Sequence, residues 1–178
     1  MGLLMLDLDG TLIADALVEV ETETGTKLQR RQQDLYSEPV LLPGVYDHLR
    51  LLAKEGDRFA IVTNQGGVAW GFHTQAECYR RISSTVGLLA GFWGRPFSIH
   101  VAFMHPRATV PAFKGDDGRK PAPTLLRAAL RAHGHNGTPP DEPPFECLMV
   151  GDRDEDREAA EAAGVSFTHA GDFFEVPF

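Results

Sequence analysis

Cysteine and long apolar runs are scarce in this sequence, and each scarcity excludes a class of protein. Cys78 and Cys147 are its only cysteines, too few and too far apart for a disulfide framework or a cysteine-rich zinc site. The apolar start of the chain soon meets Asp7 and has no basic lead, so it predicts neither a signal peptide nor a membrane span. Together these features predict a cytoplasmic protein that does not contact membranes.

Basic residues are also in the minority. With 17 basic and 25 acidic residues the net charge is −8, which disfavours indiscriminate binding to nucleic acid or to an anionic membrane. A local basic groove stays compatible with this total.

The chain does contain a regular alternation of short apolar runs and longer amphipathic segments. Buried strands are expected at residues 3–6, 59–62, 97–103, 147–150 and 165–167. Helical spacing of apolar residues is found at residues 44–55, 74–90, 123–133 and 154–163. This alternation predicts an α/β fold, a Rossmann-like three-layer α/β/α sandwich around a parallel sheet. The length of 178 residues suits a single domain over residues 1–178.

Three stretches fit neither pattern. They are the polar segment at residues 14–39, a Pro- and Gly-bearing loop at 105–118, and a surface connection at 134–144. The regions between residues 7 and 63 and between residues 63 and 120 are too short for a large cap domain, since residues 63–120 already have to contain a helix, a strand and the loop, so we expect a rather open site.

Polar residues gather where the predicted strands and one helix meet the same edge of the sheet. "LMLDLDGTLI" carries two acids out of the first strand, "IVTNQGG" follows the second, and "MVGDRDED" follows the fourth, while "GRKPAP" opens a helix. The residues concerned are Asp7, Asp9, Thr63, Asn64, Arg119, Lys120, Gly151, Asp152 and Asp156. Ligands of open parallel sheets bind outside the carboxyl ends of the strands, so these side chains are expected to share one crevice. Several carboxylates would repel one another there unless a cation lay among them.

Taken singly, each of these residues has an ordinary structural interpretation. Asp and Gly favour turns, so Asp7 and Asp9 could simply end a strand. Asp152 and Asp156 could cap a helix that begins near residue 154, and Lys120 could be a solvated lysine. Turn and cap chemistry does not, however, predict that all of them converge.

In this order, "DLDGT", "TN", "KP" and "GDRDED" resemble the four motifs of the haloacid dehalogenase-like (HAD) phosphohydrolase superfamily. The resemblance covers roughly residues 4–165. "LPGVYDHLRLLAKEGDRFAIVTNQGGVAWG" followed by "RKPAP" is similar to its subfamily III, which includes histidinol-phosphate phosphatases, heptose-bisphosphate phosphatases and polynucleotide 3′-phosphatases. The resemblance implies a HAD-like fold without a large cap and a Mg²⁺-dependent phosphomonoester hydrolase.

The resemblance also implies a role for each motif residue. Asp7 would be the nucleophile that forms an aspartyl-phosphate, and Asp9 would protonate the leaving oxygen and then activate water. Thr63 and Lys120 would bind phosphate oxygens. Asp7, the backbone carbonyl of Asp9, and Asp152 would hold the Mg²⁺.

The remaining motif residues are expected to support this site. Gly10 and Thr11 would let the chain turn tightly beneath the two acids, and Gly151 belongs to the fourth motif. Asp156 would support the metal shell from behind. Asn64 and Arg119 flank motif residues and are expected to contact substrate.

The substrate is less well defined by the sequence. The loop "MHPRATVPAFKGDDG" lacks the zinc-binding cysteines that heptose-bisphosphate phosphatases carry before the lysine motif. We expect a small phosphometabolite such as a sugar phosphate or histidinol phosphate, because no run of Lys and Arg is interleaved with aromatics. A polynucleotide 3′-phosphatase, with a local basic rim, and a non-catalytic phosphate-binding module are the alternatives. The rim would consist of Arg95, Arg107, Lys114 and Arg119.

Overall fold

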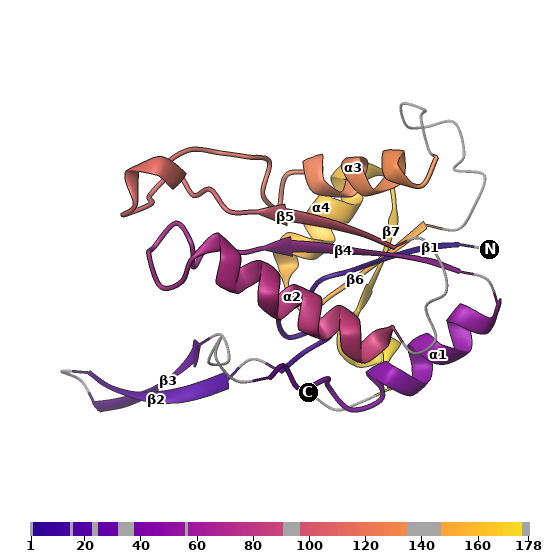
Figure 1. Cartoon of the computed structure of the whole chain (residues 1–178), viewed down its shortest axis with the longest axis horizontal. Helices are drawn as coiled ribbons and strands as arrows, with labels where there is room; N and C mark the ends of the chain where they lie inside the picture. Colours follow the sequence, from indigo (N-terminus) through magenta and orange to yellow (C-terminus); the bar gives the residue numbers. More distant parts are fainter. Residues whose placement is uncertain are drawn as a thin grey trace.

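The computed structural model describes residues 2–14, 16–22, 25–31, 38–55, 57–90, 97–134 and 147–175. They form a five-stranded sheet covered by helices on both faces, and a separate two-stranded hairpin (Figure 1). The strands of the sheet are β1 (Leu3–Leu6), β4 (Arg58–Asn64), β5 (Phe97–Ala102), β6 (Cys147–Gly151) and β7 (Ser166–His169). The helices are α1 (Val45–Glu55), α2 (Gln75–Leu89), α3 (Thr124–Ala132), α4 (Asp154–Ala163) and α5 (Ala170–Phe173), with a 3-10 turn η1 (Pro111–Phe113). Apart from Gly134, the predicted connection at 134–144 lies outside the described residues.

The sheet has the order β5-β4-β1-β6-β7, and every neighbouring pair is parallel. β1 lies at the centre, with β4 on one side and β6 on the other. This confirms the predicted three-layer α/β/α architecture, and no separate cap domain is seen among the described residues. No helix in the described ranges is both long and apolar enough to span a bilayer.

The core consists of two apolar layers, one on each face of the sheet. Successive side chains of a strand point to opposite faces, so Leu4 and Leu6 of β1 pack into one cluster while Leu3 and Met5 pack into the other. The first cluster takes in buried residues of α1, α2 and α5, and the second those of α3 and α4. Because β1 is covered on both faces, its sequence is apolar throughout instead of alternating.

The polar segment at 14–39 contains two strands that the sequence did not predict. β2 (Ala16–Thr22) and β3 (Gly25–Arg31) pair antiparallel, with Ala16 opposite Arg31 and Thr22 opposite Gly25. Figure 1 shows this hairpin extending away from the main sheet. The prediction relied on apolar runs typical of buried strands, and a hairpin outside the core does not require them.

The loop between β5 and α3 is held by hydrogen bonds as well as by packing. Asp117 Oδ2 accepts hydrogen bonds from the backbone N–H groups of Phe103 (2.7 Å) and Met104 (3.0 Å). The carbonyl oxygen of Ala69 accepts a further one from the N–H of Val110 (3.1 Å). The acidic side chain and the neighbouring turn thus fix the shape of a loop whose sequence contains no cysteine.

Candidate active site

The site lies at the carboxyl ends of β1, β4 and β6, at the centre of the sheet. Asp7 directly follows β1, and its N–H donates to the carbonyl oxygen of Val150 in β6 at 3.0 Å. Thr63 is the last residue but one of β4, and Asp152 directly follows β6. The chain runs from β1 to β4 and β5 on one side and then returns to β6 on the other, which leaves a crevice where the direction of winding changes.

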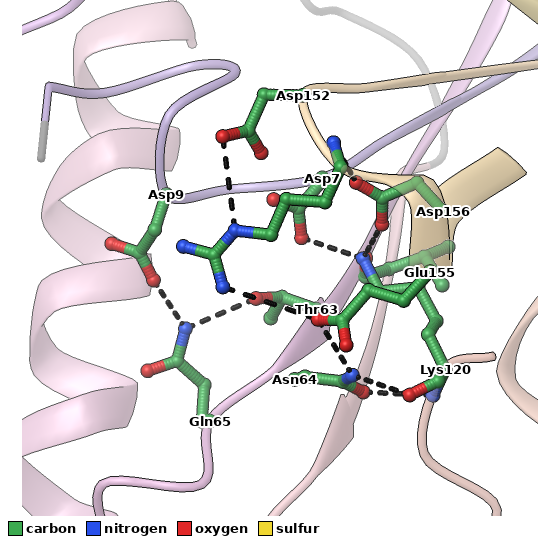
Figure 2. Close-up of polar contacts among 11 residues, drawn as sticks. Asp7, Asp9, Thr63, Asn64, Gln65, Lys120, Asp152, Glu155 and Asp156 are labelled. Carbon is green, nitrogen blue, oxygen red and sulfur yellow. Dashed lines mark hydrogen bonds and ion pairs between the residues drawn. The ribbon is translucent and has the colours of Figure 1, made fainter. Parts of the chain in front are cut away.

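Three carboxylates meet in this crevice, as Figure 2 shows. Asp7, Asp152 and Asp156 each offer an oxygen, and these oxygens all lie within 4.8 Å of one another. It is the one such group of potential metal ligands found among the described residues. Carboxylate oxygens around a small space are the donor set that a hard divalent cation such as Mg²⁺ prefers, so the residues present fit the predicted ion.

The buried side chain of Lys120 forms ion pairs with two of these acids. It is 1% exposed, and its Nζ lies 2.7 Å from Asp7 Oδ1 and 2.5 Å from Asp156 Oδ1. It also donates to the carbonyl oxygen of Val62 at 2.8 Å. The Asp156 carboxylate lies beside that of Asp7 and pairs with Lys120 (Figure 2), and its support of a metal shell from behind stays a prediction.

The electrostatics of this group favour an additional positive charge. Burial raises the pKa of the Asp7 carboxyl to about 7, even though Lys120 lowers it, and the Asp156 and Asp9 carboxylates add to the rise. Burial alone would lower the pKa of Lys120, but Asp7 and Asp156 raise it above its usual value, so its ammonium is charged. With the three acids ionised, Lys120 and Arg153, whose guanidinium lies 3.7 Å from Asp152 Oδ2, leave one negative charge in excess. A divalent cation would more than offset it and leave positive charge for a phosphate.

Two glycines make room for the acids. Gly10 has φ +82°, and a Cβ on it would lie 2.4 Å from Asp152 Oδ2. A Cβ on Gly151 would lie 2.4 Å from Asp156 Oδ2. Only a residue without a side chain allows these carboxylates to approach the backbone so closely. Thr11 continues the turn after Gly10 and is fully buried.

Asn64 and Arg119 make different contacts, and their contact with substrate stays a prediction for both. The Asn64 side chain accepts from the backbone N–H of Lys120 and donates to its carbonyl oxygen, both at 2.9 Å. This amide therefore fixes the backbone that carries Lys120. The Arg119 side chain lies along the turn after β4, where its Nη1 would be 3.3 Å from a Cβ on Gly66.

Two residues that hold Asp9, Gln65 and Arg81, were not predicted from the sequence. Gln65 Nε2 donates to Asp9 Oδ2 at 2.7 Å and to Thr63 Oγ1 at 3.0 Å. The guanidinium of Arg81 in α2 forms an ion pair with Asp9 Oδ1. The sequence does contain a signal for Arg81. It is a charged residue at helical spacing from Cys78, on the face of α2 that is otherwise apolar or small and buried.

Comparisons with known proteins agree with this architecture. A family model described as HAD-hydrolase-like matches residues 118–168. The D-glycero-β-D-manno-heptose-1,7-bisphosphate 7-phosphatase of Pseudomonas putida is 30% identical over an alignment of 169 residues that covers 92% of this chain and 79% of that protein. The enzyme of the same name from Escherichia coli K12 is 34% identical over 125 residues, covering 70% of this chain and 62% of that protein. The match thus spans less than two thirds of the E. coli protein.

A solved structure has the same fold. The D,D-heptose 1,7-bisphosphate phosphatase of B. bronchiseptica, complexed with magnesium and phosphate, superposes with a TM-score of 0.63 at 24% identity and covers 94% of this chain and 79% of its own. With the Pseudomonas match across most of both proteins, the chain belongs to the HAD-like hydrolase family. Within that family it is related to the heptose-bisphosphate phosphatases.

Proposed function

We propose that this protein is a Mg²⁺-dependent phosphatase that removes a phosphoryl group from a sugar phosphate. The observation that carries the proposal is the group of Asp7, Asp152 and Asp156, with Lys120 against two of them at the carboxyl end of the sheet. Phosphoryl transfer requires an in-line nucleophile and positive charge around the phosphoryl oxygens. This group offers a carboxylate nucleophile, an ammonium and a place for a cation.

The reaction would proceed in two displacements. An oxygen of Asp7 attacks phosphorus, the bond from phosphorus to the ester oxygen breaks, and Asp9 gives its proton to the departing oxygen. Asp9 then takes a proton from water, whose oxygen attacks the aspartyl-phosphate. This step releases inorganic phosphate and restores the Asp7 carboxylate. The hydroxyl of Thr63 and the ammonium of Lys120 bind the phosphoryl oxygens.

The cation would be held by Asp7, Asp152 and the backbone carbonyl of Asp9, with Asp156 positioning Lys120 at its side. When bound, Mg²⁺ neutralises charge on the transferred phosphoryl group. Lys120 keeps Asp7 and the phosphate together, because it lies 2.7 Å from the nucleophilic carboxylate and is buried.

The relatives support a sugar phosphate as the substrate, since those found at 30–34% identity are heptose-bisphosphate phosphatases. The loop between β5 and α3 gives a reason to test a nucleic-acid 3′ end as well. It brings Arg107, Lys114 and Arg119 into one stretch of chain and has no cysteine. Arg95, the fourth residue of the predicted basic rim, lies outside the described residues.

The test compares catalytic efficiency with Mg²⁺ on four kinds of substrate at two salt concentrations. The panel contains D-glycero-β-D-manno-heptose 1,7-bisphosphate, simple hexose phosphates, histidinol phosphate and a 3′-phosphorylated oligonucleotide. We expect a sugar phosphate to be the best substrate and its turnover to depend little on salt. An oligonucleotide that is better by orders of magnitude, with an efficiency that falls steeply as salt rises, would replace this substrate by a nucleic-acid end.

A further inference from the structure

We propose that Arg81, assisted by Gln65, is a positioning residue that fixes the carboxylate of Asp9 for proton transfer to the leaving group. This inference rests on the proposed function, because it assigns Asp9 the proton-transfer role. Neither residue belongs to the four motifs that identify the site in the sequence.

Both oxygens of the Asp9 carboxylate are held from outside the metal group. Gln65 Nε2 donates to Oδ2 at 2.7 Å, and the Arg81 guanidinium pairs with Oδ1. Figure 2 shows the Asp9 carboxylate directed toward Gln65, apart from the acids gathered around Lys120. A carboxylate held at both oxygens has one orientation, whereas one held at a single oxygen can still rotate.

The burial of Arg81 is explained by this contact. The side chain is 2% exposed and lies on the buried face of α2 with Cys78 and Ile82. Its Nε and Nη2 have no hydrogen-bond acceptor within the ranges that the structure describes. Removing a guanidinium from water is costly, and an apolar side chain would fill the same place without that cost. The ion pair with Asp9 is thus what the described residues offer in compensation.

The orientation of Asp9 matters more for some substrates than for others. Proton donation requires the acid within hydrogen-bond reach of the leaving oxygen. An alkoxide leaving a sugar needs that proton, whereas a nitrophenolate departs readily without it. Asp7 is held separately, by Lys120 at 2.7 Å. Loss of Arg81 should therefore impair proton donation and largely spare attack by the nucleophile.

The experiment measures kcat/KM of Arg81→Met on two esters, the best sugar phosphate of the panel and p-nitrophenyl phosphate. Relative to wild type, we expect kcat/KM to fall at least about 10-fold further on the sugar phosphate than on p-nitrophenyl phosphate. This is part of the roughly 10²–10⁴-fold that general acid catalysis supplies. Both esters are assayed on one preparation, so the fraction of folded protein cancels in the ratio. The matched control is Arg80→Met, the exposed neighbour on the same helix, which should leave the ratio unchanged.

Two further variants complete the test. Asp9→Asn should show the same selective loss on the sugar ester, and adding Arg81→Met to it should lower the ratio no further. Gln65→Met removes one hydrogen bond to Asp9 without removing a charge, and we expect a smaller loss of the same selectivity. This variant carries the test if Arg81→Met does not fold.

The outcomes separate the inference from the proposed function. Equal losses on both esters in Arg81→Met and Gln65→Met, or no loss, would overturn the positioning role while leaving the phosphatase in place. An additional loss in the double variant would do the same. A wild-type protein that hydrolyses neither ester with Mg²⁺ would instead overturn the proposed function, and the inference with it.

Discussion

Lys120 shows how a single buried charge can organise a site. Its ammonium lies between Asp7 and Asp156, and the carbonyl of Val62 takes a further hydrogen bond. Two acids so close together would repel each other without it. Lys120 is therefore expected to stabilise the fold as well as to bind phosphate, and the two roles can be separated by adding the cation.

Lys120→Met should destabilise the protein by on the order of 3–5 kcal/mol, the usual cost of removing one partner from a buried ion pair. Mg²⁺ should recover part of that loss, because the cation can neutralise Asp7 when the ammonium is gone. Urea unfolding with and without Mg²⁺ measures both effects. Lys114→Met, at an exposed position, is the control and should unfold like wild type. Equal stability of the two variants would contradict this role for Lys120.

Which residues the sequence could identify depended on how they reach the site. Asp7, Asp152 and Lys120 lie in short motifs at the ends of strands or at the start of a helix, so local pattern and parallel topology suffice to bring them together. Arg81 reaches Asp9 from the side of α2, and that contact depends on how the helix is rotated against the sheet. The spacing of apolar residues places Arg81 on the buried face of α2, but which acid it meets there is set by packing.

The junction of β6 and α4 depends on the absence of a side chain at Gly151. A Cβ there would meet the Asp156 carboxylate at 2.4 Å. Asp156 also caps its own helix, because its Oδ2 accepts from the backbone N–H of Arg153 at 3.1 Å. Strand, turn and helix are thus joined through one acidic side chain.

Gly151→Ala should displace Asp156 and destabilise the fold by about 1–3 kcal/mol, the range for overpacking. Turnover should fall by about 10²-fold, because Asp156 positions Lys120 beside the nucleophile and a small misplacement there is costly. Gly87→Ala is the matched control: beyond its own helix backbone, no atom of the described part of the chain would lie within 4 Å of the added Cβ, and it should stabilise α2 by about 0.5–1 kcal/mol. Thermal unfolding and turnover of both variants test this pair. A Gly151→Ala protein as active as wild type would contradict the close fit.

Asp117→Ala should loosen the loop between β5 and α3, because the N–H groups of Phe103 and Met104 lose their acceptor. Each unsatisfied group costs about 1–3 kcal/mol where water cannot replace the bond. Amide hydrogen exchange at these two positions should accelerate. In the control Asp116→Ala the lost bond is that to the N–H of Gly118, and exchange at 103 and 104 should not change. Equal exchange in both variants would show that prolines and packing alone hold the loop.

The secondary structure of the sheet could be predicted because its strands are buried on both faces and its helices carry an apolar stripe. The five strands and α1 to α4 lie within a few residues of their predicted positions. β2 and β3 were missed because neither contains an apolar run like those of the sheet, although β2 (ALVEVET) alternates apolar and polar residues, a pattern that itself indicates a strand. The four-residue α5 was missed because it is too short to display a helical repeat.

The molecule as a whole combines an acidic chain with a site that gathers acids. Its net charge is −8, and three carboxylates meet at the centre of the sheet, two of them on the Lys120 ammonium. The fold tolerates this arrangement because the topology places the acids where two halves of the sheet diverge and a ligand can enter. The positive charge that the described side chains do not supply would come from a divalent cation.

The most direct test of this account measures phosphate release from a sugar phosphate before chelation, after exhaustive chelation, and after Mg²⁺ is restored. The wild-type protein should lose its activity on chelation and regain it when Mg²⁺ is restored, because without the cation the negative charge of the site repels the phosphate. Asp7→Asn should be inactive throughout and unfold at or above the wild-type temperature, because a buried carboxylate with a raised pKa has been removed. Full activity after chelation, or wild-type turnover in Asp7→Asn, would contradict the account.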